Sequence, residues 1–443
     1  MSSDSIAYPV YGHEDATSLS RAHTDEDVTP GEIAVGVIIG RSSEYFDFFV
    51  FGIACVLVFP SLLFPFLSRL DGTLAAFALF AIAFIARPFG TAISMAVQRR
   101  WGRGTKLTLA LVVLGSCTVG MAFLPSYQAA GMAAIVALAV LRLGQGLALG
   151  GTWDGLPSLL AMAAPPERRG WYAMLGQLGA PLGFVLAASL FAYLYGSLSS
   201  AEFLDWGWRY PFCVAFAINV VALFARLRLV VGQSYAELLE EKELVPVGVT
   251  RLMRDEGGNV VLGAFAALAS FALFHVVTVF PLSWIVLYSE RSMTEVLCVQ
   301  ILGAFLSVGA VAVSGRLADR LGRRNLLGAM AVLIGVFSLA TPWLLGGGQL
   351  GGTVFLLLGF VLLGLSYGQA SGTVTANFSA QYRYTGAALS ADLAWLIGAA
   401  FAPLVALGLS ARFGLGAVTL YLLSGVVCTL GALRINRMIE RRA

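Results

Sequence analysis

Runs of about 20 mostly apolar residues recur twelve times along this 443-residue chain, and they limit what it can fold into. A helix of about 20 apolar residues crosses a bilayer, and helices or closed barrels alone satisfy their backbone groups in lipid. The chain is 58% hydrophobic and 12% charged, whereas soluble domains are about 25% charged. We therefore predict an all-α membrane protein with twelve transmembrane helices. The runs begin near Glu32, Gly72, Lys106, Gly131, Trp171, Arg209, Asn259, Met293, Asn325, Gly351, Tyr384 and Leu415.

Basic residues predict the orientation of these spans. The loops after the even-numbered spans, together with the C-terminal tail, hold 20 of the 28 Lys and Arg residues. The loops on the other side hold four, which are Arg69, Arg209, Arg291 and Arg412. Short cytoplasmic loops of membrane proteins are enriched in Lys and Arg. We expect a multi-pass protein of a bacterial-type inner (plasma) membrane with both termini in the cytoplasm.

A long polar connection divides the chain into two similar halves. It covers residues 232–258, and we expect six-helix bundles on either side of it, at 31–231 and 259–437. Residues 1–30 are predicted to be a disordered cytoplasmic tail and 438–443 a short second one. The loop WGRGTK around Gly102 is echoed by LGRRNL around Gly322, at half-chain spacing. Such an internal repeat is typical of carriers whose site lies between the halves.

Composition excludes several other classes of function. The five cysteines are scattered singly in apolar segments, and two of the three histidines, His13 and His23, lie in the polar tail. This pattern predicts neither a disulfide framework nor a metal site. We find no nucleophile or cofactor motif, and we expect no enzyme activity, no cofactor and no nucleic-acid partner. The expected partners are a small-molecule substrate, protons and membrane lipid, with the monomer as the functional unit.

Charged residues inside the spans are the candidates for function, because charge at the bilayer centre is costly unless it is paired or faces a cavity. They are Arg41, Glu44, Asp47, Arg87, Arg142, His275 and Asp392. Arg41, three residues before the stretch EYFDFFVFG (44–52), and Glu44 and Asp47 within it are spaced at i, i+3 and i+6, which places them on one side of a helix.

Asp47 and Arg142 are expected at similar depth near mid-membrane. We hypothesise that they alternate between pairing with each other and binding a proton and the substrate, respectively. Departure of the arginine would favour protonation of the acid. The alternative is a static ion pair that fixes helix packing, and Gly146 and Gly150 after Arg142 would allow close helix contact. Glu44 is a second proton-coupling candidate, or a structural partner of an arginine, Arg41 or Arg87.

The predicted substrate-binding residues are Arg142, Arg41, His275, Gln369 and Tyr367. A lone histidine on an apolar helix such as that of His275 is also a common packing residue. Four aromatic residues are either caps of a cavity or lipid- and helix-facing side chains: Tyr45, Trp153, Trp284 and Trp395.

Several motifs resemble the major facilitator superfamily, and more specifically its metabolite:proton symporter branch. In chain order they are EYFDFFVFG (44–52), RPFG (87–90), RLGQGLALGG (142–151), APPERRGWY (164–172), QLGAPLG (177–183), WGWRYPF (206–212), GRLADRLGRR (315–324) and RYTG (383–386). The resemblance implies proton symport of shikimate-, 2-oxoglutarate-, citrate-, proline- or betaine-like solutes by alternating access. It also implies gating residues, namely Arg87, Arg100, Gly102, Arg103, Asp154, Gly315, Asp319, Arg320, Gly322, Arg323 and Asp392.

The chain departs from the family pattern in its gating motifs. Arg99 stands where the first-half loop has an aspartate, and Thr152 replaces a glutamate in the fourth span. Asp154, two residues further on, is either a substitute gate acid or a solvated helix end. Asp392 falls near a usual asparagine of the eleventh span. The resemblance is therefore to a divergent member.

We expect a secondary active transporter that carries a small mono-, di- or tricarboxylate, or a zwitterionic metabolite, together with protons. Two alternatives stay open from the sequence. One is a proton-coupled exporter or antiporter of small hydrophobic or cationic solutes. The other is a ligand sensor derived from a transporter.

Overall fold

The computed structural model describes residues 30–440, apart from 154, 156–158, 161, 163, 231–236, 238–243 and 371–377. The predicted N-terminal tail, most of the linker and the gate candidate Asp154 lie outside the described residues. Within the described residues, every regular element is helical.

Helices of the first half cover residues 30–230. The long ones are α2 (Pro30–Leu57), α4 (Arg69–Ala122), α6 (Met132–Gly151), α8 (Arg169–Leu175) continued by α9 (Gly179–Ser197), and α11 (Tyr210–Val230). Short helices α3 (Phe59–Leu63), α5 (Tyr127–Ala130) and α10 (Ser200–Asp205) lie between them.

The second half is built in the same way. Its helices are α13 (Val249–Ala266), α14 (Leu268–Thr278), α15 (Phe280–Tyr288), α16 (Met293–Leu321), α17 (Arg323–Gly346), α18 (Gly348–Tyr367), α20 (Arg383–Ala394), a π-helix at Trp395–Ala400, α21 (Ala402–Phe413) and α22 (Gly416–Glu440). Helix α13 starts inside the predicted linker, and its non-helical residue Glu256 lies close to the predicted start of the seventh span.

The twelve predicted crossings are all present in the described residues. Ten helical segments are long and apolar enough to cross a membrane. One of them, Arg69–Ala122, crosses twice, because Gly102 interrupts it with a φ of 87°. Helix α2 is the remaining crossing, and it carries the three charged residues of the first span. Gly322, the repeat partner of Gly102, also has a positive φ, of 81°.

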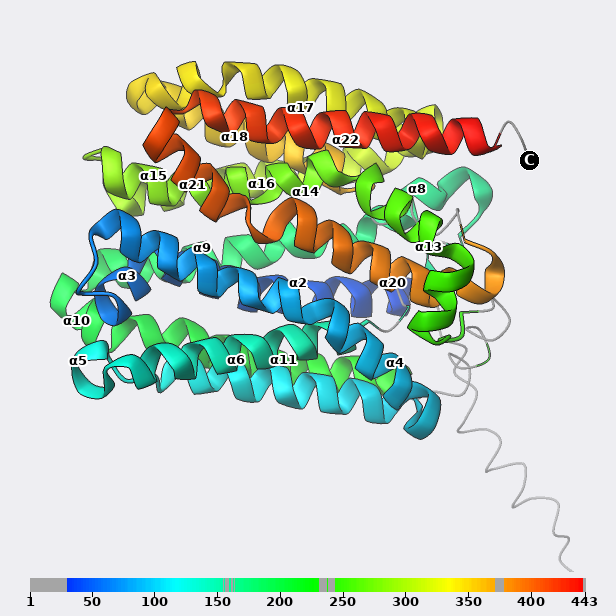
Figure 1. Cartoon of the computed structure of the whole chain (residues 1–443), viewed down its shortest axis with the longest axis horizontal. Helices are drawn as coiled ribbons and strands as arrows, with labels where there is room; N and C mark the ends of the chain where they lie inside the picture. The colour runs from blue at the N-terminus through cyan, green and yellow to red at the C-terminus, as the bar shows by residue number, and fades with distance from the viewer. Residues whose placement is uncertain are drawn as a thin grey trace, which may run out of the picture.

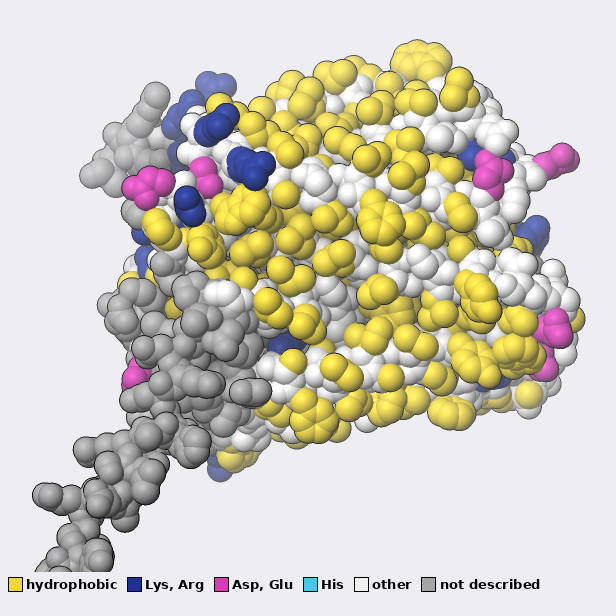
Figure 2. Space-filling view, turned by 180° about the vertical axis from the view of Figure 1, so that it is seen from behind, with side chains coloured by type: hydrophobic (Ala, Val, Ile, Leu, Met, Phe, Trp, Pro, Cys, Tyr) yellow, Lys and Arg dark blue, Asp and Glu magenta, His cyan; other side chains and the backbone are white. Residues whose placement is uncertain are grey.

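The helices lie side by side in one elongated bundle, with most of the first half below and most of the second half above in Figure 1. Across the boundary between the halves, α9 packs against α16, and α4 against α20. We call the end that holds Gly102, Gly322 and the last residues of α22 the basic end. Figure 2 shows apolar side chains covering the flank and most charged side chains gathered near the two ends, as expected for a protein that spans a membrane.

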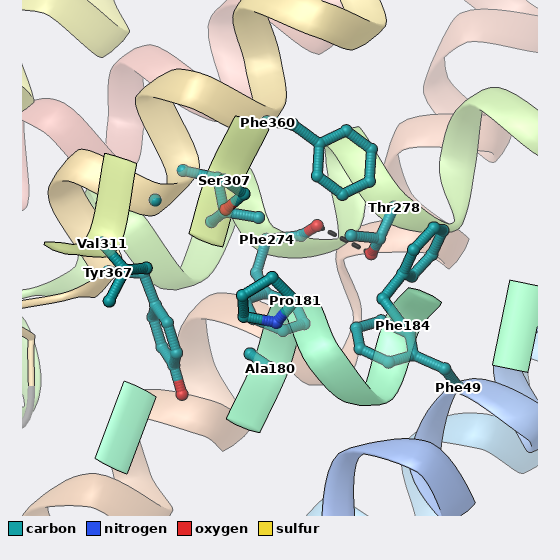
Figure 3. Close-up of a pocket in the computed structure, with 12 residues that line it drawn as sticks. Phe49, Ala180, Pro181, Phe184, Phe274, Thr278, Ser307, Val311, Phe360 and Tyr367 are labelled. Carbon is teal, nitrogen blue, oxygen red and sulfur yellow. Dashed lines mark hydrogen bonds between the residues drawn. The ribbon is translucent and has the colours of Figure 1, made fainter. Parts of the chain in front are cut away.

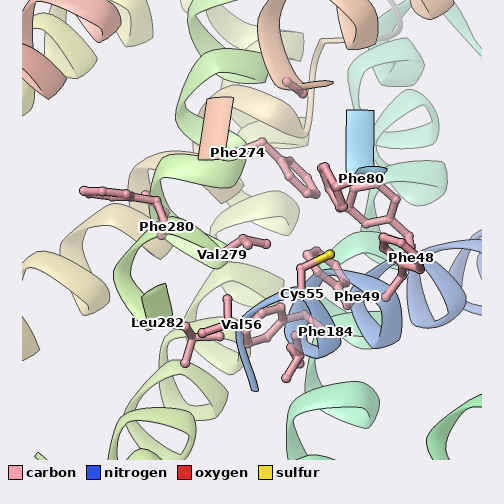
Figure 4. Close-up of a cluster of buried hydrophobic side chains, with 14 of the residues drawn as sticks. Phe48, Phe49, Cys55, Val56, Phe80, Phe184, Phe274, Val279, Phe280 and Leu282 are labelled. Atoms are coloured by element: carbon pink, nitrogen blue, oxygen red, sulfur yellow. The ribbon is translucent and has the colours of Figure 1, made fainter. Parts of the chain in front are cut away.

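Aromatic side chains fill the centre of the boundary between the halves. The rings of Phe49 and Phe274 lie nearly parallel with centroids 5.7 Å apart, and Phe48 packs edge-on against Phe80 at 5.2 Å. Figure 4 shows this cluster continuing through Val279 and Leu282 of the second half. The two halves therefore meet through a packed apolar core.

Glycines bring α4 and α6 into backbone contact, as the sequence predicts for Gly146 and Gly150. A Cβ atom on Gly146 would lie 2.3 Å from the carbonyl oxygen of Ala83. A Cβ atom on Gly150 would lie 2.3 Å from the backbone nitrogen of Thr91. Small residues allow such close helix packing in lipid. This crossing holds Arg87, one turn before Thr91, against the α6 backbone.

We expect Gly150→Ala to destabilise the protein by about 1–3 kcal/mol, because the added methyl group overpacks the α4–α6 contact. The measurement is the midpoint of thermal unfolding of the detergent-purified protein. Gly309→Ala is the matched control, since a Cβ there meets nothing within 4 Å. Equal midpoints for the two variants would contradict the prediction.

Candidate functional site

A polar cavity lies between the two halves on the basic-end side of the aromatic cluster. Its lining includes the side chains of Arg41, Tyr45, Arg87, Tyr367 and Trp395. It measures about 40 Å³, room for roughly three water molecules. A smaller neighbouring cavity of about 30 Å³ shares four of these residues. We call the two together the central cavity.

An apolar cavity of about 10 Å³ lies next to it. Figure 3 shows its wall, in which Phe49, Pro181 and Phe184 of the first half face Phe274 and Phe360 of the second. Tyr367 lines both this cavity and the central one. Its hydroxyl group contacts the hydroxyl group of Tyr45 across the boundary between the halves.

Two ion pairs border the central cavity. Arg87 Nε lies 2.7 Å from Asp392 Oδ1, which joins α4 of the first half to α20 of the second. Thr91 donates its hydroxyl hydrogen to the other oxygen of Asp392. Arg41 Nη1 donates to Glu44 Oε2 at 2.8 Å. The sequence prediction that Glu44 pairs with Arg41 or Arg87 is thus met by Arg41.

Glu44 has a second cationic partner, Arg226 of α11. Arg226 Nη1 donates to Glu44 Oε1 at 2.6 Å, and its Nη2 donates to the carbonyl oxygen of Thr152 at 2.5 Å. The side chain reaches across Gly40, where a Cβ atom would lie 2.8 Å from Arg226 Cδ. Arg226 therefore ties α2, α6 and α11 together beside the cavity.

Positive charge is in excess around the central cavity. Three guanidinium groups and two carboxyl groups line it or pair with its lining residues: Arg41, Arg87 and Arg226, and Glu44 and Asp392. If all are ionised, one positive charge remains without a carboxylate partner. A site of this charge suits an anion, and guanidinium groups bind carboxylates through paired hydrogen bonds.

Asp47 lies apart from this cavity, inside the first half. Its carboxylate accepts from the Thr118 hydroxyl at 2.7 Å, from Gln145 Nε2 at 3.2 Å and from Asn219 Nδ2 at 3.4 Å. Ser43 donates to Asn219 Oδ1 at 2.6 Å. These side chains come from four different helices of one half, so the carboxyl group is fully enclosed by it.

The direct Asp47–Arg142 pair that the sequence predicts is not formed, because Gln145 lies between the two side chains. Arg142 Nη1 donates to Gln145 Oε1 at 2.8 Å, and its Nη2 donates to the carbonyl oxygen of Phe80 at 3.2 Å. The guanidinium lies 4.0 Å from the centroid of the Phe51 ring. Arg142 does not line the central cavity, and its contacts are those of a side chain that organises the first half.

Two other predicted substrate-binding residues also lie away from the central cavity. His275 is enclosed by aromatic rings, with Phe48 stacked at 5.0 Å and Phe80 edge-on at 5.2 Å. Its Nδ1 lies 3.4 Å from the hydroxyl oxygen of Thr278. Gln369 Nε2 donates to the carbonyl oxygen of Gly170 at 3.1 Å, at the contact between the halves. Of the predicted substrate-binding residues, Arg41 and Tyr367 do line it.

A carboxylate of the second half closes the basic end against the first half. Asp319 accepts from the backbone N–H groups of Gly170 at 2.6 Å and Trp171 at 3.2 Å, in the first turn of α8. Arg323 Nη2 donates to the carbonyl oxygen of Arg169 at 3.1 Å. Gly315 lies beneath Trp171, whose Cα would be 3.0 Å from an added Cβ.

The first half closes its side of the basic end with different chemistry. Arg99, at the position of the missing acid, is exposed. Instead, the buried Tyr384 of α20 inserts into the first half, where its hydroxyl lies 3.2 Å from both Lys106 Nζ and Gln98 Oε1. Lys106 also donates to the carbonyl oxygen of Trp153. The contact of the first half with α20 is thus made by a lysine and a phenol rather than by a carboxylate.

The remaining predicted gating residues lie around these contacts. Arg100 and Arg320 are exposed, and Arg103 is half-buried. The guanidinium of Arg100 lies 5.1 Å from the centroid of the Trp101 ring.

The halves also touch at the end opposite the basic end. A Cβ on Gly52 would lie 3.2 Å from Val279, and one on Gly196 would lie 3.5 Å from Thr294. Since both ends are in contact and the central cavity has room for only about three water molecules, the structure represents an occluded state.

The sequence analysis did not identify several of these side chains as candidates, above all Arg226 of α11. A signal was present, because Asn219 and Arg226 are seven residues apart and share one face of a helix. Their common face predicts a polar side on the sixth span. Tyr384 and Lys106 carry no comparable pattern, since their contact joins two halves.

Comparison with known proteins gives consistent matches. The model of the family described as Major Facilitator Superfamily matches residues 126–403. The inner membrane metabolite transport protein YhjE of Escherichia coli is 35% identical over 94% of this chain and 97% of its own. The shikimate transporter of the same organism is 30% identical over 97% of each chain. The structure of the proton:xylose symporter XylE matches with a TM-score of 0.69 and 20% identity, over 90% of this chain and 94% of that one.

We expect Asp319→Asn to loosen the basic end, because a charged acceptor at the two N–H groups becomes neutral. A loss of about 1.5 kcal/mol would raise the population open at this end roughly tenfold. The measurement is the alkylation rate of a cysteine placed at Ser390 in the central cavity. The rate of the parent protein without this cysteine is subtracted as background. Glu167→Gln, an exposed acid at the same end, is the matched control. Equal rates in both variants would argue against this gate.

Proposed function

Since the chain belongs to the Major Facilitator Superfamily and is a membrane transporter, we propose that it carries a small organic acid together with protons by alternating access. The observation that carries this proposal is the central cavity, in which two arginine side chains face aromatic walls at the contact between the halves. The excess of positive charge around that cavity supports an anionic substrate. The similarity to a shikimate transporter, which is named for a carboxylic acid, agrees with this.

In this proposal, Arg87 and Arg41 bind the substrate carboxylate. Each already holds a carboxylate of the protein, Asp392 and Glu44 respectively. An anionic substrate competes with these intramolecular partners, and a carboxyl group that loses its cation gains affinity for a proton. Occupancy of the cavity and protonation are thereby coupled. Tyr367 and Trp395 supply flat walls against which an apolar part of a small acid packs.

Asp47 is the proposed main proton site. Its carboxyl group lies in the membrane interior, where the neutral form is less costly than the ion. Thr118, Gln145 and Asn219 stabilise the ionised form with hydrogen bonds, so both forms are tolerated. Arg142 responds to its charge through Gln145 rather than by direct pairing. Glu44 is the second candidate, with Arg41 and Arg226 as partners that favour its ionised form.

We also propose that the protein lies in the inner membrane as a functional monomer, with the basic end and both termini in the cytoplasm. Clustering of Lys and Arg at that end supports this orientation.

The Arg87–Asp392 pair provides a test of substrate binding. We expect Arg87→Gln to weaken carboxylate binding by about two orders of magnitude, the size of two charge-assisted hydrogen bonds. Scintillation proximity or calorimetric binding to the purified protein measures this. The charge-balanced variant Arg87→Gln/Asp392→Asn separates the roles, because it removes the guanidinium without leaving an unpaired carboxylate. Recovered affinity in the double variant would mean that Arg87 acts only as the partner of Asp392.

Proton coupling is tested in liposomes that contain a pH-sensitive dye. A panel of mono-, di- and tricarboxylates and betaines is added outside, and we expect at least one carboxylate to acidify the lumen. Asp47→Asn is expected to abolish substrate-driven acidification while substrate exchange continues, because exchange needs no net proton movement. Asp205→Asn, an exposed acid, is the matched control and should behave as the wild type.

Other outcomes of the same assay separate the alternatives. Alkalinisation of the lumen by added substrate would indicate an antiporter. Binding of a ligand without any flux would indicate a sensor. Accumulation against a gradient in Asp47→Asn would remove Asp47 from the coupling step.

A further inference from the structure

A groove lies on the membrane-facing side of the second half at the basic end, between the first turns of α17 and the last turns of α22. It measures about 650 Å³, against 40 Å³ for the central cavity. Three arginines line it, Arg324 from α17 and Arg434 and Arg437 from α22. The two helices run side by side at the top of Figure 1, with the C-terminus at the basic end.

Small side chains make this groove. Gly328 and Ala329 form its floor on α17, opposite Leu430 of α22. The nearest atom to a Cβ on Gly328 would be Leu433 Cδ1, at 3.8 Å, so the floor remains shallow and open. The gap between the two helix ends therefore exists because Gly328 and Ala329 have almost no side-chain volume.

The groove continues into the part of the surface that faces the lipid tails. Toward the middle of the molecule, Val332 and Val336 of α17 are 52% and 60% exposed, and Val427 of α22 is 68% exposed. These residues follow the groove along both helices at one-turn spacing. One surface thus runs from arginine side chains at the membrane edge to exposed apolar side chains within the membrane.

The charged side chains that line the groove in the described residues are all basic. Among its described lining residues there is no acidic side chain. Arg437 Nη2 donates to Asn325 Oδ1 at 3.3 Å, which fixes one guanidinium at the rim. The N-terminus of the 24-residue helix α17 lies at the same rim, and its dipole adds a positive potential. The groove therefore attracts an anion at one end and hydrocarbon at the other.

We propose that this groove binds one anionic phospholipid, with its phosphate on the three arginines and an acyl chain along the apolar surface between α17 and α22. A soluble anion would use the arginines but would leave the apolar floor without a partner. Basic pockets between transmembrane helices at the membrane edge have the chemistry that anionic headgroups need. The proposal is independent of which solute the protein carries.

Native mass spectrometry of the detergent-purified full chain tests this site. The probes are dioleoyl phosphatidylglycerol and dioleoyl phosphatidylcholine, titrated separately, with inorganic phosphate as a competitor. We expect the wild type to bind one phosphatidylglycerol more tightly than phosphatidylcholine. Arg324→Gln/Arg434→Gln/Arg437→Gln should weaken phosphatidylglycerol binding roughly 100-fold, because each arginine contributes a factor of somewhat less than about ten to the affinity.

The matched control is Arg99→Gln/Arg168→Gln/Arg254→Gln, which removes the same charge from exposed positions at the basic end. It should bind phosphatidylglycerol as the wild type does, and unfolding midpoints establish that both triple variants are folded. Equal losses in the two variants would overturn the proposal in favour of a general charge effect. Displacement by inorganic phosphate would reduce the groove to an ion site, and a two-chain mass without lipid would reassign it to contact between copies.

Discussion

Charge inside a membrane has to be compensated locally, and the rest of this structure depends on how that is done. Glu44 lies between two guanidinium groups, Arg41 and Arg226. Asp392 takes one guanidinium from the other half, that of Arg87. Asp47 instead receives neutral donors from three helices. The three acids are thus compensated in three ways, by two cations, by one cation across the boundary, and by hydrogen bonds alone.

At the basic end, the two halves of the internal repeat contact each other through different side chains. Asp319 of the second half accepts from the first turn of α8, where the helix dipole favours a negative charge. In the first half, Arg99 would repel such an N-terminus, and it points away to solvent. Tyr384 enters from α20 and meets Lys106. The two repeated loops share a backbone feature, the positive φ of Gly102 and Gly322, but their side-chain contacts differ.

The number and order of the helices and most of their starts follow from the sequence, because each crossing is a local property of about 20 residues. A close helix contact of α6 also follows, since Gly146 and Gly150 are spaced by one turn, although the sequence does not identify α4 as the partner. Side-chain partners across helices do not, because they depend on helix rotation. Arg142 illustrates the limit. The rotation of α6 directs its guanidinium at the carbonyl group of Phe80 rather than at Asp47, and Gln145 bridges Arg142 and Asp47.

The location of each network decides what a rocking movement can change. Asp47 and all its hydrogen-bond partners belong to the first half, so rigid-body rotation of the halves leaves that environment intact. The Arg87–Asp392 pair and the Tyr45–Tyr367 contact cross the boundary, and rotation separates them. A solute that takes Arg87 from Asp392 weakens a link between the halves at the moment it binds. In the proposed mechanism, the substrate therefore triggers opening at the pair that spans the boundary, and Asp47 carries the proton through the movement.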